Sequence, residues 1–168
     1  MIKVGILTIS DKGSRGERED LSGKTIKDII AKIEGKVEYY KIIPDEKEII
    51  KKELIKAVDK LHLDLILTTG GTGLAKRDVT PDATLGVIEK EVSGISEIIR
   101  NESFKKTNRA ILSRAVSGIR KESLIINLPG SPKGVRESLK IILDSLPHGM
   151  EILKGQAVEC GKNDEEIR

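Results

Sequence analysis

Short apolar segments alternate along this chain with longer segments whose apolar residues recur every three or four positions. The apolar segments cover residues 2–9, 37–43, 64–68 and 124–128. Bounded runs of this length are typical of buried strands. The first repeating segment has the spacing of one helix face and contains Ile26, Ile29, Ile30 and Ile33. Strands alternating with helices predict an α/β fold, in which helices cover both faces of a mainly parallel sheet.

Particular residues mark where several helices begin and end. Thr80-Pro81 is typical of an N-cap followed by proline, and predicts a helix over residues 81–91. Ser131-Pro132 predicts a last long helix in the same way. The other expected features are a helix ended by Gly35, a helix starting near Asp45, helices over 94–105 and 148–154, and the end of the last long helix at Pro147. Residues 110–119 fit either a strand or a loop.

Length and composition predict one domain over residues 1–155, followed by a polar tail over residues 156–168. The net charge of +3 and three aromatic residues do not indicate a nucleic-acid partner. No apolar run approaches the ~18 residues of a membrane-spanning helix, and the N-terminus lacks the pattern of a signal peptide. The only cysteine, Cys160, excludes a disulfide framework. We therefore expect a cytoplasmic protein with no membrane partner.

Polar and glycine-rich residues follow four of the predicted strands. They are Ser10 with Asp11, residues 44–46, residues 70–84 and residues 127–132. In open α/β sheets, ligands bind outside the carboxyl ends of the strands. If the strands are parallel, these four segments meet at one edge of the sheet, and the sequence predicts a single site there.

The segment TTGGTG at residues 68–73 has two interpretations. Adjacent glycines let backbone N–H groups approach a phosphate, and the hydroxyls of Thr69 and Thr72 would add donors. The alternative is a tight turn that needs positive φ. The following KRDVTPD supplies two cations and two carboxylates before a helix N-terminus, which favours anions. Residues 129–131 similarly fit either a second anion-binding turn or an ordinary helix start.

Three aspartates near predicted helix starts differ in how well capping explains them. Asp45 with Glu48 fits a capping box, and the pattern alone favours that structural explanation. Asp82 would lie in the first turn of its helix, where the helix dipole is a sufficient explanation. Asp78 lies before Thr80, where capping does not explain it, so it is the candidate for chemistry.

Several familiar catalytic devices do not fit the sequence. Gly23-Lys24-Thr25 resembles the end of a P-loop, but six residues separate Gly16 from Gly23 where a P-loop needs four. His62 and His148 are predicted at the surface, which makes a Ser-His-Asp device or a histidine metal site improbable. A site with glycines, aspartates, Lys and Arg but few histidines suits a different reaction, the attack of an ionised phosphate on the α-phosphorus of ATP. This attack needs no side-chain base. It needs positioning, carboxylates for Mg²⁺ and cations for the phosphates.

Five sequence blocks occur in order along the chain. They are ILTISDKGS at residues 6–14, IPDE at 43–46, TTGGTGLAKRDVTPDAT at 68–84, AILSRAVSGIR at 110–120 and LIINLPGSPKGVRE at 124–137. Together these blocks resemble the molybdopterin adenylyltransferase family, of the MogA and MoaB type, from about residue 3 to residue 155. The sequence departs from the family pattern in two places: residues 74–76 are Leu-Ala-Lys in a stretch that varies, and Ser131 stands where relatives often carry an amide.

The resemblance implies a three-layer αβα single domain that forms a homotrimer. It implies transfer of AMP from Mg-ATP to the terminal phosphate of molybdopterin, release of pyrophosphate, and hand-over of the product to a downstream metal-insertion protein. Asp45, Asp78 and Ser113 match the residues of the family's active site, and the two aspartates are expected to hold Mg²⁺. The expected binding residues are Ser10, Asp11, Thr69, Gly70, Gly71, Thr72, Gly73, Asn127, Pro129, Gly130 and Ser131.

Two other interpretations remain open. One is a non-catalytic molybdopterin-binding or scaffold domain of the same fold. The other is a nucleotide-hydrolysing or amidase relative. The intact Asp45 and Asp78 favour the enzyme. The sequence leaves open whether the pathway carries molybdenum or tungsten.

Overall fold

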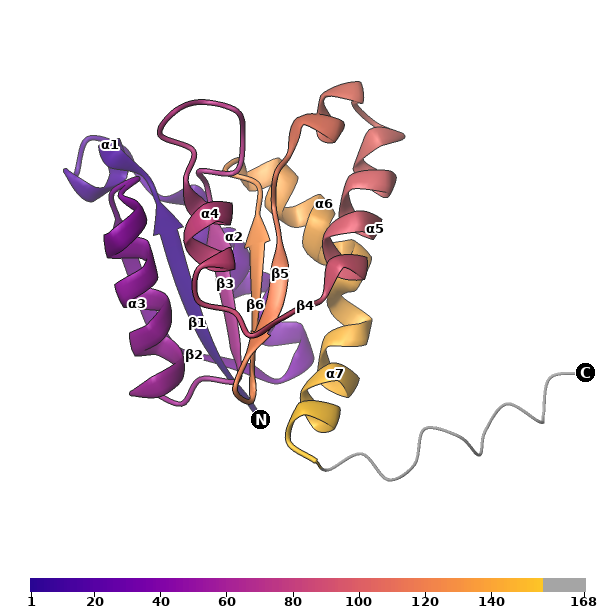
Figure 1. Ribbon diagram of the computed structural model, residues 1–168. Coiled ribbons are helices and arrows are strands. Elements are labelled where there is room, and N and C mark those ends of the chain that lie inside the picture. The colour runs from indigo at the N-terminus through magenta and orange to yellow at the C-terminus, as the bar shows by residue number, and fades with distance from the viewer. Residues whose placement is uncertain (156–168) are drawn as a thin grey trace, which may run out of the picture.

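The four apolar segments form the parallel strands of a six-stranded sheet in the computed structural model, which describes residues 1–155 (Figure 1). The strand order is β2-β1-β3-β6-β5-β4. The strands are β1 (Ile2–Ile9), β2 (Gly35–Ile43), β3 (Leu65–Thr69), β4 (Lys90–Glu91), β5 (Ser117–Arg120) and β6 (Ser123–Leu128). Strand β1 pairs in parallel with β2 and β3, and β3 pairs in parallel with β6. Strands β5 and β4 are added beyond β6 in antiparallel pairings, so the sheet is mostly parallel, as predicted.

Helices cover both faces of this sheet. They are α1 (Asp11–Ser14), α2 (Leu21–Ile30), α3 (Lys47–Asp59), α4 (Thr80–Leu85), α5 (Ser93–Phe104), α6 (Pro132–Ile142) and α7 (Leu146–Leu153). Short 3₁₀ turns lie at η1 (Ala31–Ile33), η2 (Asn108–Leu112) and η3 (Leu143–Ser145). One core cluster packs α2, α5, α6 and α7 on one face, and a second packs α3 and α4 on the other. Neighbouring residues Ile6 and Leu7 of β1 belong to opposite clusters, as the alternation of a strand requires. The expected three layers are therefore confirmed.

Two helix starts differ from the sequence prediction. Helix α4 begins at Thr80 itself, and the Thr80 hydroxyl caps nothing; it donates to the carbonyl oxygen of Gly70 at 2.9 Å. Asp45 does not cap α3, because its carboxylate accepts from the backbone N–H of Asp11 at 2.8 Å. Both capping predictions were wrong because these side chains form hydrogen bonds with other loops instead of with the helix that follows them. The Ser131 cap is confirmed: its hydroxyl accepts from the N–H of Gly134 at 3.0 Å.

The bounds of several other helices and strands also differ from the prediction. The helix expected over 81–91 ends at Leu85, and β4 follows at residues 90–91. The segment 110–119, left open between strand and loop, contains part of η2 and most of β5. The helix α2 ends before Gly35, and Pro147 lies in the first turn of α7 rather than ending α6. The predicted tail over 156–168 lies outside the described residues. No helix within residues 1–155 is long and apolar enough to cross a membrane.

An ion pair joins the end of α3 to the antiparallel strand β5. Arg120 donates from Nη2 to Asp59 Oδ2 at 2.7 Å, and from Nη1 to the carbonyl oxygen of Val87 at 3.0 Å. The hydrogen bond from Arg120, with a further contribution from Lys121, lowers the pKa of Asp59 from 3.8 to about 2. The carboxylate is therefore held more tightly in the folded chain than in the unfolded one.

This linkage predicts how the stability effect of Asp59→Asn depends on pH. Because the folded pKa is depressed, the carboxylate stabilises the fold fully above pH 3.8, and this contribution is lost as the pH falls towards about 2. The variant should be less stable than the wild type near neutral pH, and the difference should shrink over that window. Urea unfolding at a series of pH values measures it. A difference that stays constant with pH would contradict the assignment.

Candidate functional site

The carboxyl ends of β1, β2, β3 and β6 lie at one edge of the sheet, at the top of Figure 1, because these strands are parallel. The residues that the sequence singled out follow these ends. Ser10 and Asp11 follow β1, Asp45 follows β2, the glycine loop at residues 70–73 follows β3, and residues 129–131 follow β6. The predicted convergence of the four segments is therefore present.

Two cavities open at this edge. The α2 cavity, of about 580 Å³, is bounded by the end of β1, the start of α2, Asp45, Gly70 and Gly71. The α5 cavity, of about 510 Å³, is bounded by Thr72, Gly73, α5, η2 and the start of α6. The glycine loop thus borders both cavities, and Ser131 lines both. This arrangement offers space for two ligands that meet near one loop.

The glycines of the loop are required by close packing. Gly70 has φ +98°, and a Cβ built on it would lie 2.3 Å from the carbonyl oxygen of Ile9. Gly71 has φ +65°, and its Cβ would lie 2.4 Å from Thr80 Oγ1 and 3.1 Å from Asp45 Oδ1. Side chains are excluded by both the backbone conformation and the contacts. The tight-turn interpretation therefore describes these positions, and phosphate binding by the same loop stays a prediction.

Asp11 and Asp45 hold each other's backbone. The N–H of Asp11 donates to Asp45 Oδ2 at 2.8 Å, and the N–H of Asp45 donates to Asp11 Oδ1 at 3.1 Å. Burial raises the pKa of Asp45, and the nearby charges of Asp11 and Asp78 raise it further, against the effects of the Asp11 N–H and of Arg77. The half-buried carboxylate of Asp45 therefore lies near other negative charges, and a bound cation would reduce the repulsion between them.

Asp78 lies on the outer part of the loop between β3 and α4. Its Oδ2 accepts from the N–H of Ala75 at 2.9 Å, and a Cβ built at Gly73 would lie 2.8 Å from the same oxygen. Asp45 and Asp78 thus both lie against the glycine loop, at Gly71 and Gly73, and the charge of Asp78 contributes to the raised pKa of Asp45. Residues 1–155 contain no group of three His, Cys, Asp or Glu side chains placed to hold a metal. Two carboxylates fit Mg²⁺ when phosphate oxygens complete its ligands.

Two arginines hold the loop that carries Asp78. Arg77 donates to both carboxylate oxygens of Asp11, at 2.6 and 2.9 Å, and to Glu46 Oε1 at 2.8 Å. These bonds lower the pKa of Asp11 and raise the pKa of Arg77. Arg114 contacts the other side of the loop. The sequence alone gave Arg114 no function, although the residue stands in the matched block at residues 110–120.

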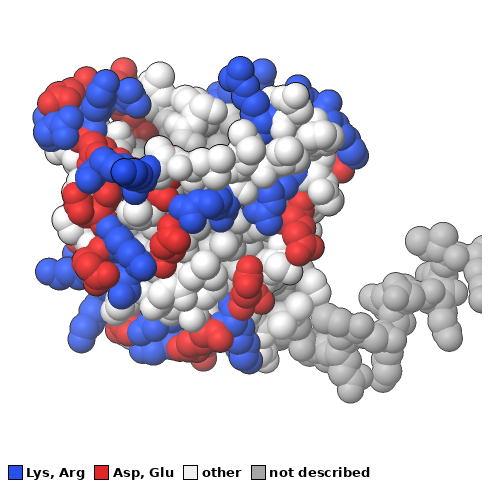
Figure 2. Space-filling view, turned by 45° about the horizontal axis from the view of Figure 1, so that its top comes forward, with Lys and Arg blue, Asp and Glu red and all other residues white. Residues whose placement is uncertain are grey.

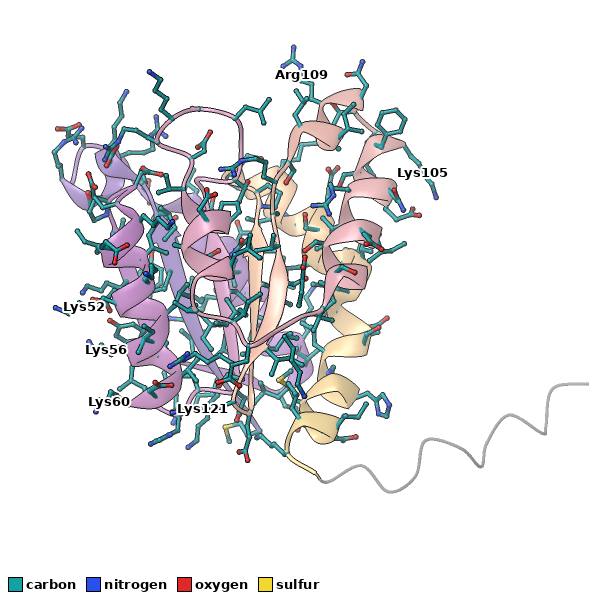
Figure 3. All side chains as sticks on the ribbon, viewed as in Figure 1. Lys52, Lys56, Lys60, Lys105, Arg109 and Lys121 are labelled. Atoms are coloured by element: carbon teal, nitrogen blue, oxygen red, sulfur yellow. The ribbon has the colours of Figure 1, made fainter. Side chains whose placement is uncertain are left out.

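Cations surround the α5 cavity. The positively charged lining residues are Arg100, Lys106, Arg109 and Lys133, against one carboxylate, Glu137, which pairs with Lys106 at 3.3 Å. Figure 2 shows blue side chains at the rim above α5 and η2, and Figure 3 shows Arg109 extending from η2. Ser113 lines the same cavity and its hydroxyl accepts from the N–H of Ala115 at 3.3 Å. None of the four cations was singled out from the sequence, because single Lys and Arg residues on helices carry no local pattern.

Two expected binding residues use their polar groups within the protein. Asn127 is 1% exposed, and its Nδ2 donates to the hydroxyls of Thr68 and Thr84 at 3.0 and 2.9 Å. The Thr69 hydroxyl donates to the carbonyl oxygen of Pro129 at 2.6 Å. Asn127 lines the α5 cavity and Thr69 lines the α2 cavity. The structure therefore gives both residues a positioning function, and direct ligand contact by either stays a prediction.

Known proteins match this chain along nearly its whole length. The family described as a probable molybdopterin binding domain matches residues 5–148. The molybdopterin adenylyltransferase of Helicobacter pylori is 43% identical over 97% of this chain and 94% of its own length. The corresponding protein of Escherichia coli is 39% identical over 94% of this chain and 88% of its own length.

Solved structures agree with the sequence matches. The molybdopterin biosynthesis enzyme MoaB of Thermus thermophilus has a TM-score of 0.88 and 49% identity, covering 95% of this chain and 100% of that one. The tungsten cofactor synthesizing protein MoaB of Pyrococcus furiosus has a TM-score of 0.82 and 37% identity, covering 93% and 97%. With the fold, the site and these matches in agreement, the chain belongs to the molybdopterin adenylyltransferase family.

Proposed function

We propose that this protein transfers AMP from Mg-ATP to the terminal phosphate of molybdopterin and releases pyrophosphate. The observation that carries the proposal is the pair of cavities on either side of one glycine loop, with Asp45 and Asp78 beside that loop. A reaction between two substrates needs two adjoining sites. The relatives named as adenylyltransferases match 94–97% of the chain, which supports the same conclusion.

The two cavities differ in charge, and this difference suggests which ligand each one takes. Asp45 lines the α2 cavity, so a nucleotide that arrives with Mg²⁺ suits that side. The four cations of the α5 cavity suit the anionic molybdopterin. The outer face of the glycine loop, where the cavities adjoin, would then hold the reacting phosphates, with Ser113 on the molybdopterin side.

The proposed step forms one bond and breaks one bond. A phosphate oxygen of molybdopterin bonds to the α-phosphorus of ATP, and the bond from that phosphorus to the α–β bridging oxygen breaks. Pyrophosphate leaves with the electron pair. The attacking phosphate is already ionised, so the protein supplies positioning and electrostatic stabilisation rather than a base. When bound, Mg²⁺ would neutralise charge on the triphosphate, and Asp45 and Asp78 would hold it.

The proposal extends to the setting of the reaction. We place the protein in the cytoplasm, where its product would pass to a downstream metal-insertion protein. We also propose a homotrimer. Light scattering at micromolar concentration should give about three times the 18.4 kDa mass of the chain, and the monomer mass would contradict the trimer.

We expect Asp78→Asn to abolish most turnover with little effect on folding. The change keeps the shape of the side chain and removes the charge that would hold the metal. Because such a metal supplies several kcal/mol of transition-state stabilisation, kcat and kcat/KM should both fall by about a hundredfold or more. Pyrophosphate release from Mg-ATP, measured with and without molybdopterin, tests this.

The matched control is Asp28→Asn, an exposed aspartate of α2 outside both cavities. It should turn over normally. Normal turnover by Asp78→Asn, or a loss explained by unfolding in a thermal melt, would exclude the proposed assignment of Asp78. If the wild type binds molybdopterin but releases no pyrophosphate, the protein is instead a non-catalytic molybdopterin-binding domain.

Gly71→Ala should weaken nucleotide binding by displacing Asp45. The new Cβ would collide with Thr80 Oγ1 and approach Asp45 Oδ1, in addition to the strain of positive φ. Gly16→Ala is the control, because Gly16 also has positive φ but has no atom within 4 Å of its Cβ. Both variants should lose about 1–2 kcal/mol of stability from strain. Only Gly71→Ala should lose Mg-ATP affinity by calorimetry; equal affinities would show that the loop is only a turn.

A further inference from the structure

Arg114 contacts both ends of the exposed loop that carries Asp78. Its Nε donates to the carbonyl oxygen of Gly73 at 3.0 Å, and its Nη2 donates to the carbonyl oxygen of Asp78. Its backbone N–H donates to the carbonyl oxygen of Thr72 at 2.9 Å. One residue thus fixes the loop at its start and at its end, from a segment 36 positions further along the chain than Asp78.

Asp82 orients the guanidinium group that makes these contacts. Arg114 donates to Asp82 Oδ2 from Nη2 at 2.9 Å and to Oδ1 from Nη1 at 3.3 Å. The pairing lowers the pKa of Asp82 and raises the pKa of Arg114. The sequence explained Asp82 by the dipole of α4 alone. The carboxylate does lie in the first turn of α4, but its side chain also holds the planar fork of Arg114 in the direction of the loop.

The residues between the two ends of the loop have few other anchors. Residues 74–77 are exposed, and Leu74 is 66% exposed. Within the loop, the N–H of Asp78 donates to the carbonyl oxygen of Ala75 at 2.9 Å, which closes a local turn. Arg77 ties the loop to Asp11 of α1 and to Glu46 at the start of α3. Arg114 supplies the corresponding tie on the α5 side, next to Ser113.

We propose that Arg114 is a positioning residue, which clamps residues 73–78 so that the carboxylate of Asp78 stays against the glycine loop that Asp45 also contacts. The inference rests on the proposed function, because it concerns how the expected Mg²⁺ ligand is placed. The clamp also connects the two halves of the site. Ser113, which lines the α5 cavity, precedes Arg114 directly, so the same segment borders one ligand and positions the carboxylate for the other.

Three variants separate positioning from ordinary stability. Arg114→Lys keeps the positive charge and loses the planar fork that reaches two carbonyls and a carboxylate at once. Asp82→Asn keeps the shape of the partner and removes its charge. The matched control is Arg120→Lys, because Arg120 makes the same kind of fork, on Asp59 and the carbonyl oxygen of Val87. Arg120 ends β5 at the opposite edge of the sheet from the site.

The first measurement is amide hydrogen exchange of residues 73–79, which needs no activity. Exchange at Ala75 and Asp78, whose N–H groups are hydrogen-bonded within the loop, should be faster in Arg114→Lys than in the wild type. Asp82→Asn should show a smaller change in the same direction, and Arg120→Lys should show none. Unchanged exchange in Arg114→Lys would overturn the clamp, as would an equal increase in Arg120→Lys.

The second measurement is pyrophosphate release as a function of Mg²⁺ concentration. Arg114→Lys should lower kcat by about tenfold to a hundredfold, the scale of a misplaced catalytic group. It should raise the Mg²⁺ concentration needed for half-maximal rate and leave KM for molybdopterin unchanged. Arg120→Lys should lower the melting temperature without moving either quantity. A normal Mg²⁺ dependence in Arg114→Lys would overturn the proposal.

The two measurements keep this inference distinct from the proposed function. If the wild type releases no pyrophosphate, the proposed function fails, and the exchange of residues 73–79 still decides whether Arg114 clamps the loop. If Arg114→Lys does not fold, Asp82→Asn replaces it in both measurements. In that variant, unchanged exchange or unchanged Mg²⁺ dependence would overturn the clamp.

Discussion

The site depends on a close approach of backbone segments at the carboxyl edge of the sheet. Gly70 lies so near the end of β1 that an added Cβ would be 2.3 Å from the Ile9 carbonyl oxygen, and a Cβ on Gly130 would be 3.3 Å from Gly70 Cα. Without this approach, the ends of β1, β3 and β6 would stay further apart. Short polar bonds between the loops, such as Thr80 to the Gly70 carbonyl, become possible only at this spacing. The glycines therefore act first on the protein's own backbone.

Buried hydrogen bonds then make the arrangement specific. The Asn127 amide joins β6 to Thr68 of β3 and Thr84 of α4, and its Oδ1 accepts from the N–H of Val116 at 3.3 Å. Because an unpaired buried amide would cost about 1–3 kcal/mol, each partner must stay in place. This network sets the start of β5, and with it the segment that carries Ser113 and Arg114. The geometry of the site is thus determined partly by the hydrogen bonds that Asn127 makes within the protein.

The sequence predicted the strands and caps that depend on burial or on local backbone. It did not predict features that depend on a hydrogen-bond partner in a distant segment. Strands β1, β3 and β6 are apolar runs because both of their faces are buried, and the Ser131 cap needs only local backbone. Thr80 and Asp45 also resembled caps, since a hydroxyl or carboxylate before a helix looks the same whether it binds that helix or another loop. Strand β4 was not predicted, and the segment of β5 was left open between strand and loop, because both strands are short and have no apolar run. The Arg114 contacts span distant segments and leave no local pattern.

The two sides of the glycine loop differ in charge. Two arginines at the loop, Arg77 and Arg114, are already engaged by carboxylates of the protein, so they do not neutralise Asp45 fully. Burial and neighbouring negative charges still raise the pKa of Asp45, which means that its ionised form lacks sufficient positive charge nearby. The α5 cavity has the opposite character, because Lys and Arg side chains line it. One side of the glycine loop thus favours a ligand that brings a cation, and the other favours an anion. A metal-bound nucleotide and a phosphate-bearing acceptor are together complementary to that division, and the place where they would meet is the loop held by Arg114.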